Sequence, residues 1–286
     1  MPEVALPLSA VLAEAADALR AAGMPDARRQ GLRIWSDLND VPVEQPILAQ
    51  QQPVDPERAS RFLQAIHRRA AGEPLPYVTG KAGFRHLTLR IDQRALIPRP
   101  ETEGLVELLL DRVSTGVVAD VGTGSGCIAL SLATEAEFRT VLAIDRSLEA
   151  LQLARLNHQL LDRPAGVRFV RADLVTALVP ESLDALVSNP PYLTLSEYAS
   201  LDPSVREWEP AGALTAGSDG LEAITRLLHE GWTVVRPAGW LALEVDSNRS
   251  AAAAQLASGC GWRDLSVHQD LFGRERYLLA RRSDTR

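Results

Sequence analysis

An apolar run leads directly into a glycine-rich turn in the stretch Val117-Val118-Ala119-Asp120-Val121-Gly122-Thr123-Gly124-Ser125-Gly126. The apolar residues are typical of a buried strand, and the residues from Cys127 to Ala133 begin a helical pattern. Glycine lets the backbone turn sharply and lets a ligand approach where a Cβ would obstruct it. The stretch therefore predicts a strand, a ligand-binding turn and a helix in succession.

The same alternation of strand and helix continues along the chain. Apolar runs occur at 117–121, 140–145, 167–171, 183–188 and 239–245, and helical patterns lie between and after them at about 124–135, 147–161, 219–236 and 249–258. Such alternation predicts a mostly parallel sheet covered on both faces. The last two runs, 262–268 and 276–280, are joined by a loop too short for a crossover, so we expect them to pair antiparallel. The predicted fold class is therefore α/β, with a Rossmann-like seven-stranded sheet whose C-terminal strand is antiparallel.

The first 75 residues have a different pattern. Apolar residues recur at helical spacing between Leu8 and Ala22, and Asp55-Pro56 is typical of a helix start before the apolar positions up to Ala70. Two weaker helices are predicted at 26–38 and 43–51. We therefore expect a helical substrate-recognition domain at 1–75, an extended hairpin-like linker at 76–100 and a catalytic domain at 101–286.

Composition restricts the class of protein. The chain has 286 residues, of which 46% are hydrophobic and 23% charged, and its net charge is −7. These values are typical of a globular protein, and no run is long enough for a membrane helix or arranged as a signal peptide, so we expect a cytoplasmic protein without a membrane partner. Two cysteines and five scattered histidines predict neither a disulfide framework nor a metal site. The net negative charge disfavours a nucleic-acid-binding protein.

The spacing around the glycine turn indicates the kind of ligand. Asp145 ends the next strand, 19 residues after Gly126, where a carboxylate can accept hydrogen bonds from both hydroxyls of a ribose. The glycines follow G-x-G-x-G and not G-x-G-x-x-G, which disfavours a nicotinamide dinucleotide. Asp173, after the third strand, is placed either to accept from the amine of adenine or to cap a helix. We therefore expect a nucleoside-bearing cofactor held by Gly122, Thr123, Gly124, Ser125, Gly126, Asp145 and Asp173.

A rigid loop follows the fourth strand, with the sequence Asn189-Pro190-Pro191-Tyr192. Its prolines lack N–H groups and hold the preceding residues extended, so the loop is stiff and rich in hydrogen-bond acceptors. The Asn189 side-chain oxygen and the Pro190 carbonyl can each accept one hydrogen of an NH₂ group, and the Tyr192 ring can stack on the target. In isolation such a loop can be a simple double-proline turn. Combined with the glycine turn and Asp145, it predicts methyl transfer to a flat nitrogen, on either a base or an amide.

At these motifs the chain resembles the peptide chain release factor glutamine methyltransferases, which use S-adenosylmethionine. The resemblance is carried by four segments and weakly by a fifth: Gly72-Glu73-Pro74-Leu75-Pro76-Tyr77-Val78-Thr79-Gly80, Leu96-Ile97-Pro98-Arg99-Pro100-Glu101-Thr102-Glu103, Asp120 to Gly126, Asn189 to Tyr192, and Gly217-Ser218-Asp219-Gly220-Leu221. It spans nearly the whole chain. The glycine turn and the Asn189 loop occur in many amino-methylating enzymes, so the first two segments matter most for the substrate.

The resemblance implies the sheet of class I methyltransferases, S-adenosylmethionine as cofactor, and the glutamine of a Gly-Gly-Gln tripeptide in class I release factors as substrate. It places Leu174 with Asp173 beside the adenine and Asn189 beside the cofactor as well as the substrate. It implies that the residues from Arg99 to Thr102 line the cleft. It also implies that Arg99 and Glu101 join Asn189, Pro190, Pro191 and Tyr192 at the substrate, with Asn189, Pro190 and Tyr192 catalytic. The chain departs from the family pattern at Glu244-Val245-Asp246-Ser247-Asn248, where a glycine and a glutamine usually follow the glutamate, and at Leu174, where an aromatic residue is frequent.

Two other functions fit parts of this pattern. An adenine methyltransferase for DNA or a guanine methyltransferase for ribosomal RNA also uses such a loop, on a flipped base. Residues 1–75 carry eight arginines, no lysine and ten acids, which makes a poor nucleic-acid platform, so we expect no direct nucleic-acid binding. A cofactor-binding protein without activity is the other alternative, and the intact Asn189 loop argues against it.

Overall fold

The computed structural model describes residues 6–161 and 166–283, and the chain divides into two compact units. The smaller unit comprises residues 1–81 together with 202–208, and the larger unit comprises residues 82–201 and 209–286. The chain therefore leaves the larger unit after residue 201 and returns to it at Glu209.

The smaller unit is helical. Its helices are α1 (Leu8–Ala21), α2 (Ala27–Asn39), α3 (Gln45–Leu48), α4 (Pro56–Ala70), α5 (Leu75–Thr79) and α10 (Pro203–Arg206). Trp35 and Phe62 meet edge to face in its core, with ring centroids 5.2 Å apart. The Asp55 side chain accepts a hydrogen bond from the Arg58 backbone N–H at the start of α4. The structure thus confirms the helices predicted in this part of the sequence.

The segment from 76 to 100 is only partly extended. Residues 76–79 belong to α5, so the prediction of extended chain from residue 76 is wrong. Pro76 lies in the first turn of this helix, where a missing N–H costs nothing, and Gly80 ends it with a φ of 71°. The predicted hairpin does follow, since β1 (Lys81–Phe84) and β2 (Leu87–Arg90) form a two-stranded sheet.

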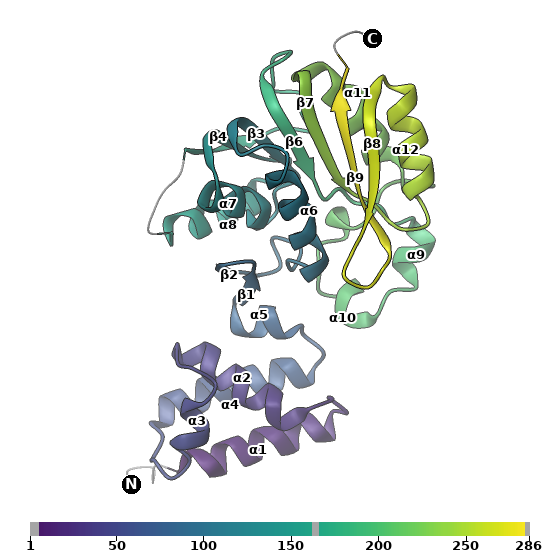
Figure 1. The fold of residues 1–286 in the computed structure, drawn as a ribbon. Helices are drawn as coiled ribbons and strands as arrows, with labels where there is room; N and C mark the ends of the chain where they lie inside the picture. The colour runs from purple at the N-terminus through teal and green to yellow at the C-terminus, as the bar shows by residue number, and fades with distance from the viewer. Residues whose placement is uncertain (1–5, 162–165, 284–286) are drawn as a thin grey trace. The chain divides into compact units, whose positions relative to one another are not determined.

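The larger unit is built on a seven-stranded sheet (Figure 1). Its strands are β3 (Thr115–Val121), β4 (Glu137–Asp145), β5 (Val167–Arg171), β6 (Leu183–Ser188), β7 (Val235–Glu244), β8 (Trp262–Gln269) and β9 (Glu275–Arg282). They lie in the order β5-β4-β3-β6-β7-β9-β8. The first five pair in parallel, and β9 runs antiparallel to both β7 and β8. This arrangement confirms the predicted fold class.

Helices cover both faces of the sheet (Figure 1). On one face α6 (Pro100–Leu110) and α7 (Cys127–Glu135) share a core with Val118, and on the other α11 (Glu222–Val234) and α12 (Ser250–Gly259) share a core with Ala119. Adjacent strand residues point to opposite faces, which explains why the strands read as continuous apolar runs. The remaining elements are α8 (Leu148–Gln159), which packs on β4 and β5, α9 (Leu195–Ala199) and the short helix η1 (Ala211–Ala213). In the described ranges, we find no helix with the length and apolar character needed to span a bilayer.

The strand order reverses at β3, because the chain moves outward on one side to β4 and β5 and then returns to β6 on the other side. Val118 is paired with Val141 of β4 and with Ala185 of β6. The Ser188 hydroxyl donates to the Val121 carbonyl over 2.6 Å, which holds the ends of β3 and β6 together. Open α/β sheets bind ligands at such a reversal, beyond the carboxyl ends of the strands.

Candidate active site

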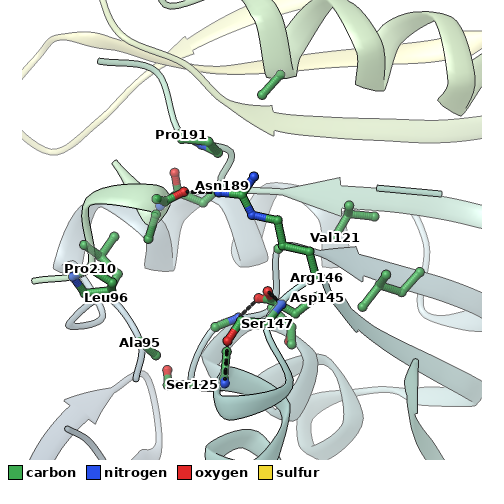
Figure 2. Close-up of a pocket in the computed structure, with 18 of the residues that line it drawn as sticks. Ala95, Leu96, Val121, Ser125, Asp145, Arg146, Ser147, Asn189, Pro191 and Pro210 are labelled. Atoms are coloured by element: carbon green, nitrogen blue, oxygen red, sulfur yellow. Dashed lines mark hydrogen bonds between the residues drawn. The ribbon is translucent and has the colours of Figure 1, made fainter. Parts of the chain in front are cut away.

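A cavity of about 360 Å³ lies in the larger unit at this reversal (Figure 2). Its walls come from residues 94–99, the glycine turn after β3, the ends of β4 and β5, the loop after β6, and residues 210–217. Its volume is within the range of about 300 to 1,000 Å³ that is usual for small-molecule sites. The cavity is therefore in the place where the sequence predicted the cofactor.

The glycine turn has the geometry of a cradle. Gly122 has a φ of 76°, and a Cβ built there would meet no atom of the described residues within 4 Å. The Gly124 N–H donates to Asp145 Oδ2 over 3.0 Å, and the Ser147 N–H donates to Asp145 Oδ1 over 2.9 Å. Each carboxylate oxygen keeps a lone pair for a further donor. The turn thus leaves room for a ligand beside Gly122 and orients an acidic acceptor toward it.

A buried asparagine side chain stabilises the glycine turn through hydrogen bonds to the backbone. Asn157 of α8 is 1% exposed, and its Nδ2 donates to the Ser125 carbonyl over 2.9 Å and to the Arg90 carbonyl over 3.0 Å. Its Oδ1 accepts from the Arg90 N–H over 2.7 Å. These bonds connect β2, α8 and the glycine turn, so the backbone that faces the cavity is held in place.

Asp120 is the buried acid within the turn. Its Oδ2 accepts from the Thr123 hydroxyl over 2.6 Å and from the Ala129 N–H over 3.0 Å, while its Oδ1 has no hydrogen-bond partner in the described residues. Burial raises the pKa of Asp120 to about 7, against the lowering effect of these two donors. Asp120 therefore holds the turn closed and binds a proton more tightly than an ordinary carboxylate.

The end of β5 supplies a third part of the wall. Asp173 and Leu174 both line the cavity, and Asp173 Oδ2 lies 2.9 Å from Arg226 Nη1. The hydrogen bond that Arg226 donates to Asp173 is the largest cause that raises the pKa of Arg226. Leu174 has a φ of 50°, a region that costs a non-glycine residue about 1 to 3 kcal/mol and that clusters at functional sites. Asp173 is followed by a turn, and no helix starts there, which removes the helix-cap alternative.

The loop after β6 contributes only some of its residues to the cavity. Asn189 and Pro191 line the cavity, whereas Pro190 is buried and neither it nor Tyr192 is a lining residue. Asn189 Nδ2 donates to the hydroxyl oxygen of Thr102 over 3.0 Å. Burial, and next the charge of Glu244, raise the pKa of Tyr192. Tyr192 is therefore a neutral phenol close to Glu244.

The loop before α6 is anchored by a buried acid. Arg99 Nη2 donates to Glu209 Oε1 over 2.6 Å, and the Ile97 N–H donates to Glu209 Oε2 over 3.1 Å. The Glu209 side chain is 1% exposed. Glu101 does not line the cavity, but its carbonyl accepts from the Tyr277 hydroxyl over 2.5 Å. Arg99 thus lines the cavity while it neutralises Glu209.

Most of the residues predicted from sequence meet at this one cavity. The predicted residues that line it are Arg99, Thr102, Gly122, Thr123, Gly124, Ser125, Asp145, Asp173, Leu174, Asn189 and Pro191. Gly126, Glu101, Pro190 and Tyr192 do not line it. Sequence reasoning missed Glu209, Arg146, Arg226 and the wall formed by residues 210–217. The only signal for that wall was the weak motif at 217–221, and Glu209 had none.

This sheet order, with a cavity between a glycine turn and a strand-terminal acid, defines the class of S-adenosylmethionine-dependent methyltransferases. A family model described as "Methyltransferase small domain" matches residues 100–200, and one described as "PrmC N-terminal domain" matches residues 10–80. A crystal structure of a methyltransferase from Pyrococcus furiosus has the same fold, with a TM-score of 0.53 and 18% identity over 79% of this chain and 98% of that chain.

Relatives in sequence specify the family. The release factor glutamine methyltransferase of Cereibacter sphaeroides is 38% identical over 93% of this chain and 98% of its own length. That of Moorella thermoacetica is 42% identical over 82% of this chain and 84% of its own length. The chain therefore belongs to the release factor glutamine methyltransferase family. It is an enzyme with S-adenosylmethionine as cofactor, and the open space beside Gly122 and the acceptor at Asp145 fit that cofactor.

Proposed function

We propose that this enzyme methylates the side-chain amide nitrogen of the glutamine in the Gly-Gly-Gln motif of class I peptide chain release factors, in the cytoplasm. The observation that carries the proposal is the side chain of Asn189, which is held at the cavity wall with its nitrogen bonded to Thr102. That bond leaves the Asn189 oxygen available as an acceptor for an incoming NH₂ group. The relatives are release factor glutamine methyltransferases, which supports a release factor glutamine as the source of that group.

Each part of the cavity has a role in this proposal. The residues of the cavity wall that hold the cofactor are Gly122, Thr123, Gly124, Ser125 and Asp145, with Asp173 and Leu174 beside its adenine. Gly126 ends the same turn and packs against Ala154 and Leu130. The Asp145 carboxylate accepts from ribose hydroxyls with the lone pairs that Gly124 and Ser147 leave free. When bound, the cofactor supplies an electrophilic methyl group. Arg99 and Glu101 belong to the segment that borders the substrate, where Arg99 lines the cavity itself.

The reaction requires alignment more than a strong base. An amide nitrogen shares its lone pair with the carbonyl, so it attacks a methyl group only when it is held in line and when the positive charge that develops on it is stabilised. Asn189 Oδ1, at the cavity wall, accepts one hydrogen of the NH₂ group, and the carbonyl of Pro190, the next residue in the loop and outside that wall, accepts the other, so that both requirements are met. Tyr192 packs beside the target. After transfer, the nitrogen is acidic enough to lose its proton to water or to a weak acceptor.

The smaller, helical unit is assigned to recognition of the protein substrate. It carries its own buried core and includes the segment that matches the N-terminal family model. Its first 75 residues have a net charge of minus two, so direct binding to nucleic acid is not expected.

A labelling assay tests the proposal. The purified enzyme, supplied with methyl-labelled S-adenosylmethionine, is expected to label an unmodified class I release factor, and replacement of the tripeptide glutamine is expected to abolish the label. A release factor with a different glutamine replaced is the matched control and keeps the label. Label in DNA or ribosomal RNA, or label that survives loss of the tripeptide glutamine, would contradict the substrate assignment.

The Asn189→Ala variant tests the role of the loop. Loss of the acceptor is expected to lower kcat about a hundredfold, as for removal of one charge-stabilising group. The Kd for S-adenosylmethionine, measured by calorimetry, should change less than threefold. Equal losses in kcat and cofactor affinity would show that Asn189 serves the cofactor and not the target amide.

A further inference from the structure

Three side chains that are far apart in the sequence form a hydrogen-bonded chain behind the Asn189 loop. Asn189 Nδ2 donates to Thr102 Oγ1 over 3.0 Å, and Thr102 Oγ1 donates to Glu244 Oε2 over 2.7 Å. Thr102 is in the first turn of α6, and Glu244 is the last residue of β7. Thr102 and Glu244 are each 2% exposed, so neither has access to bulk solvent.

The number of hydrogens on these three side chains determines the direction of each hydrogen bond. An ionised carboxylate only accepts hydrogen bonds, so the single hydrogen of the Thr102 hydroxyl is directed at Glu244. The Thr102 oxygen can then only accept, and only the nitrogen of the Asn189 amide can donate to it. The Asn189 oxygen is therefore directed away from Thr102. When Glu244 is ionised, these two hydrogen bonds determine that the nitrogen of the Asn189 amide, and not its oxygen, faces Thr102.

We infer that Thr102 and Glu244 are positioning residues that hold the Asn189 side chain with its oxygen, and not its nitrogen, toward the amide to be methylated. The inference rests on the proposed function, in which Asn189 accepts a hydrogen bond from the target NH₂ group. A flipped Asn189 would present its own NH₂ group to that of the substrate, and two donors would face each other. Thr102 lines the cavity beside Asn189, whereas Glu244 does not. Neither touches the substrate in this scheme, so both act through Asn189.

The charge of Glu244 controls this arrangement. Burial raises the pKa of Glu244 to about 7, and the Thr102 hydrogen bond is the main effect in the opposite direction. The other titratable groups that face it are Arg99, Glu101, Cys127, Tyr192, Arg276 and Tyr277, of which the two arginines favour its ionised form. A protonated Glu244 can itself donate to Thr102, whose hydrogen is then free to point at Asn189. The flipped amide becomes accessible as the pH falls below about 7.

Variants of Thr102 and Glu244 test the inference by kinetics. Thr102→Val keeps the shape and removes the hydroxyl, and Glu244→Gln removes the acceptor-only group. Both are expected to lower kcat for release factor methylation about ten- to a hundredfold, as for misplacement of a positioning group, with the Kd for S-adenosylmethionine unchanged. Thr102→Ser keeps the hydroxyl and should stay within about threefold of wild type. Thr140→Val, at a half-buried threonine of β4 that does not line the cavity, is the matched control and should leave kcat unchanged.

The pH profile separates positioning from a general loss of structure. Wild-type kcat should rise between pH 6 and pH 8 with a midpoint near 7, and this rise should be absent in Glu244→Gln and Thr102→Val. A Thr102→Val variant with wild-type kcat and wild-type profile would overturn the inference. So would an equal loss in Thr102→Ser, because the hydroxyl would then be irrelevant.

A measurement without substrate keeps the inference separate from the proposed function. The chain has four asparagines, Asn39, Asn157, Asn189 and Asn248, so selective ¹⁵N labelling gives four side-chain NH₂ signals. The Asn189→Ala variant identifies the Asn189 pair. We expect this pair to shift with a midpoint near pH 7 in wild type and to lose that titration in Thr102→Val. If the wild-type enzyme labels no release factor, the proposed function fails. Independently of that result, an Asn189 NH₂ signal that changes neither with pH nor in the Thr102→Val variant would overturn the positioning role.

Discussion

The Gly124 N–H donates a hydrogen bond to Asp145 Oδ2 over 3.0 Å, so the glycine turn after β3 and the acid at the end of β4 form one unit. The Ser147 N–H occupies the other carboxylate oxygen over 2.9 Å. Both donors are backbone groups, so the carboxylate is oriented before any ligand binds. Such preorganisation lowers the entropic cost of binding.

Asp145→Asn is expected to weaken cofactor binding. An amide in this place has one oxygen, so its NH₂ group would face the N–H of Gly124 or of Ser147, and one ligand acceptor would be lost. Hydrogen bonds to charged groups contribute about 1.5 to 3 kcal/mol, which corresponds to a rise of about 10- to 100-fold in the Kd for S-adenosylmethionine by calorimetry. Asp264→Asn, at an exposed carboxylate of β8, should leave this Kd unchanged. A wild-type Kd in Asp145→Asn would remove Asp145 from the cofactor site.

Gly122→Ala and Gly23→Ala form a matched pair. Both glycines have positive φ, 76° and 72°, and within the part of the chain that the structure describes a Cβ at either would meet no atom within 4 Å. Each substitution should cost about 1 to 2 kcal/mol of unfolding free energy, because the left-handed conformation is strained for alanine. Only Gly122→Ala places a methyl group in the cavity, so only it should abolish cofactor binding by calorimetry. Equal binding by both variants would show that the space beside Gly122 is not the cofactor's space.

The fold could be predicted because local patterns and topology agree over most of the larger unit. The predictions were least accurate at the starts of two strands. The run predicted at 140 begins at Glu137, since Glu137 and Arg139 alternate with the buried Phe138 at the exposed beginning of β4. β7 begins at Val235 and not at 239, with Pro237 and a positive φ at Ala238 inside it. Exposed and irregular strand ends lack the continuous apolar signal on which the prediction relied.

The candidate site was predictable where its residues follow strands directly, as Gly122, Asp145 and Asn189 do. The opposite wall comes from the irregular connection between α9 and α11, which has no periodic pattern. Glu209 accepts a hydrogen bond from Ile97, which is 112 residues away in the sequence, and Glu244 accepts one from Thr102, which is 142 residues away. Such contacts are set by the packing of the whole unit, so local sequence carries no sign of them.

Arg99→Ala is expected to destabilise the larger unit through Glu209. Removal of the guanidinium leaves a buried carboxylate whose one remaining partner among the described residues is the Ile97 N–H, at a cost of about 2 kcal/mol in urea unfolding. A second substitution, Glu209→Gln, removes the unpaired negative charge and should restore about half of the lost unfolding free energy. Arg94→Ala breaks a pair with the half-exposed Asp92 and should cost less than about 1 kcal/mol. Wild-type stability in Arg99→Ala would show that the Glu209 pair does not anchor the loop.

Asp120→Asn should change how stability depends on pH. Burial raises the pKa of Asp120 from 3.8 to about 7, so between these values the folded protein binds a proton that the unfolded chain has released. The contribution of Asp120 to the unfolding free energy is therefore fully present below about pH 4 and is lost as the pH rises through 7. Asparagine does not titrate, and its oxygen can still accept from Thr123 and Ala129. The unfolding free energy of Asp120→Asn minus that of wild type should thus rise by up to about 4 kcal/mol between pH 4 and pH 8, measured by urea unfolding. Glu244 titrates in the same range in both proteins and cancels in this difference, and Asp264→Asn should give a difference that is flat with pH. A flat difference for Asp120→Asn as well would mean that Asp120 is ionised in the folded protein throughout this range.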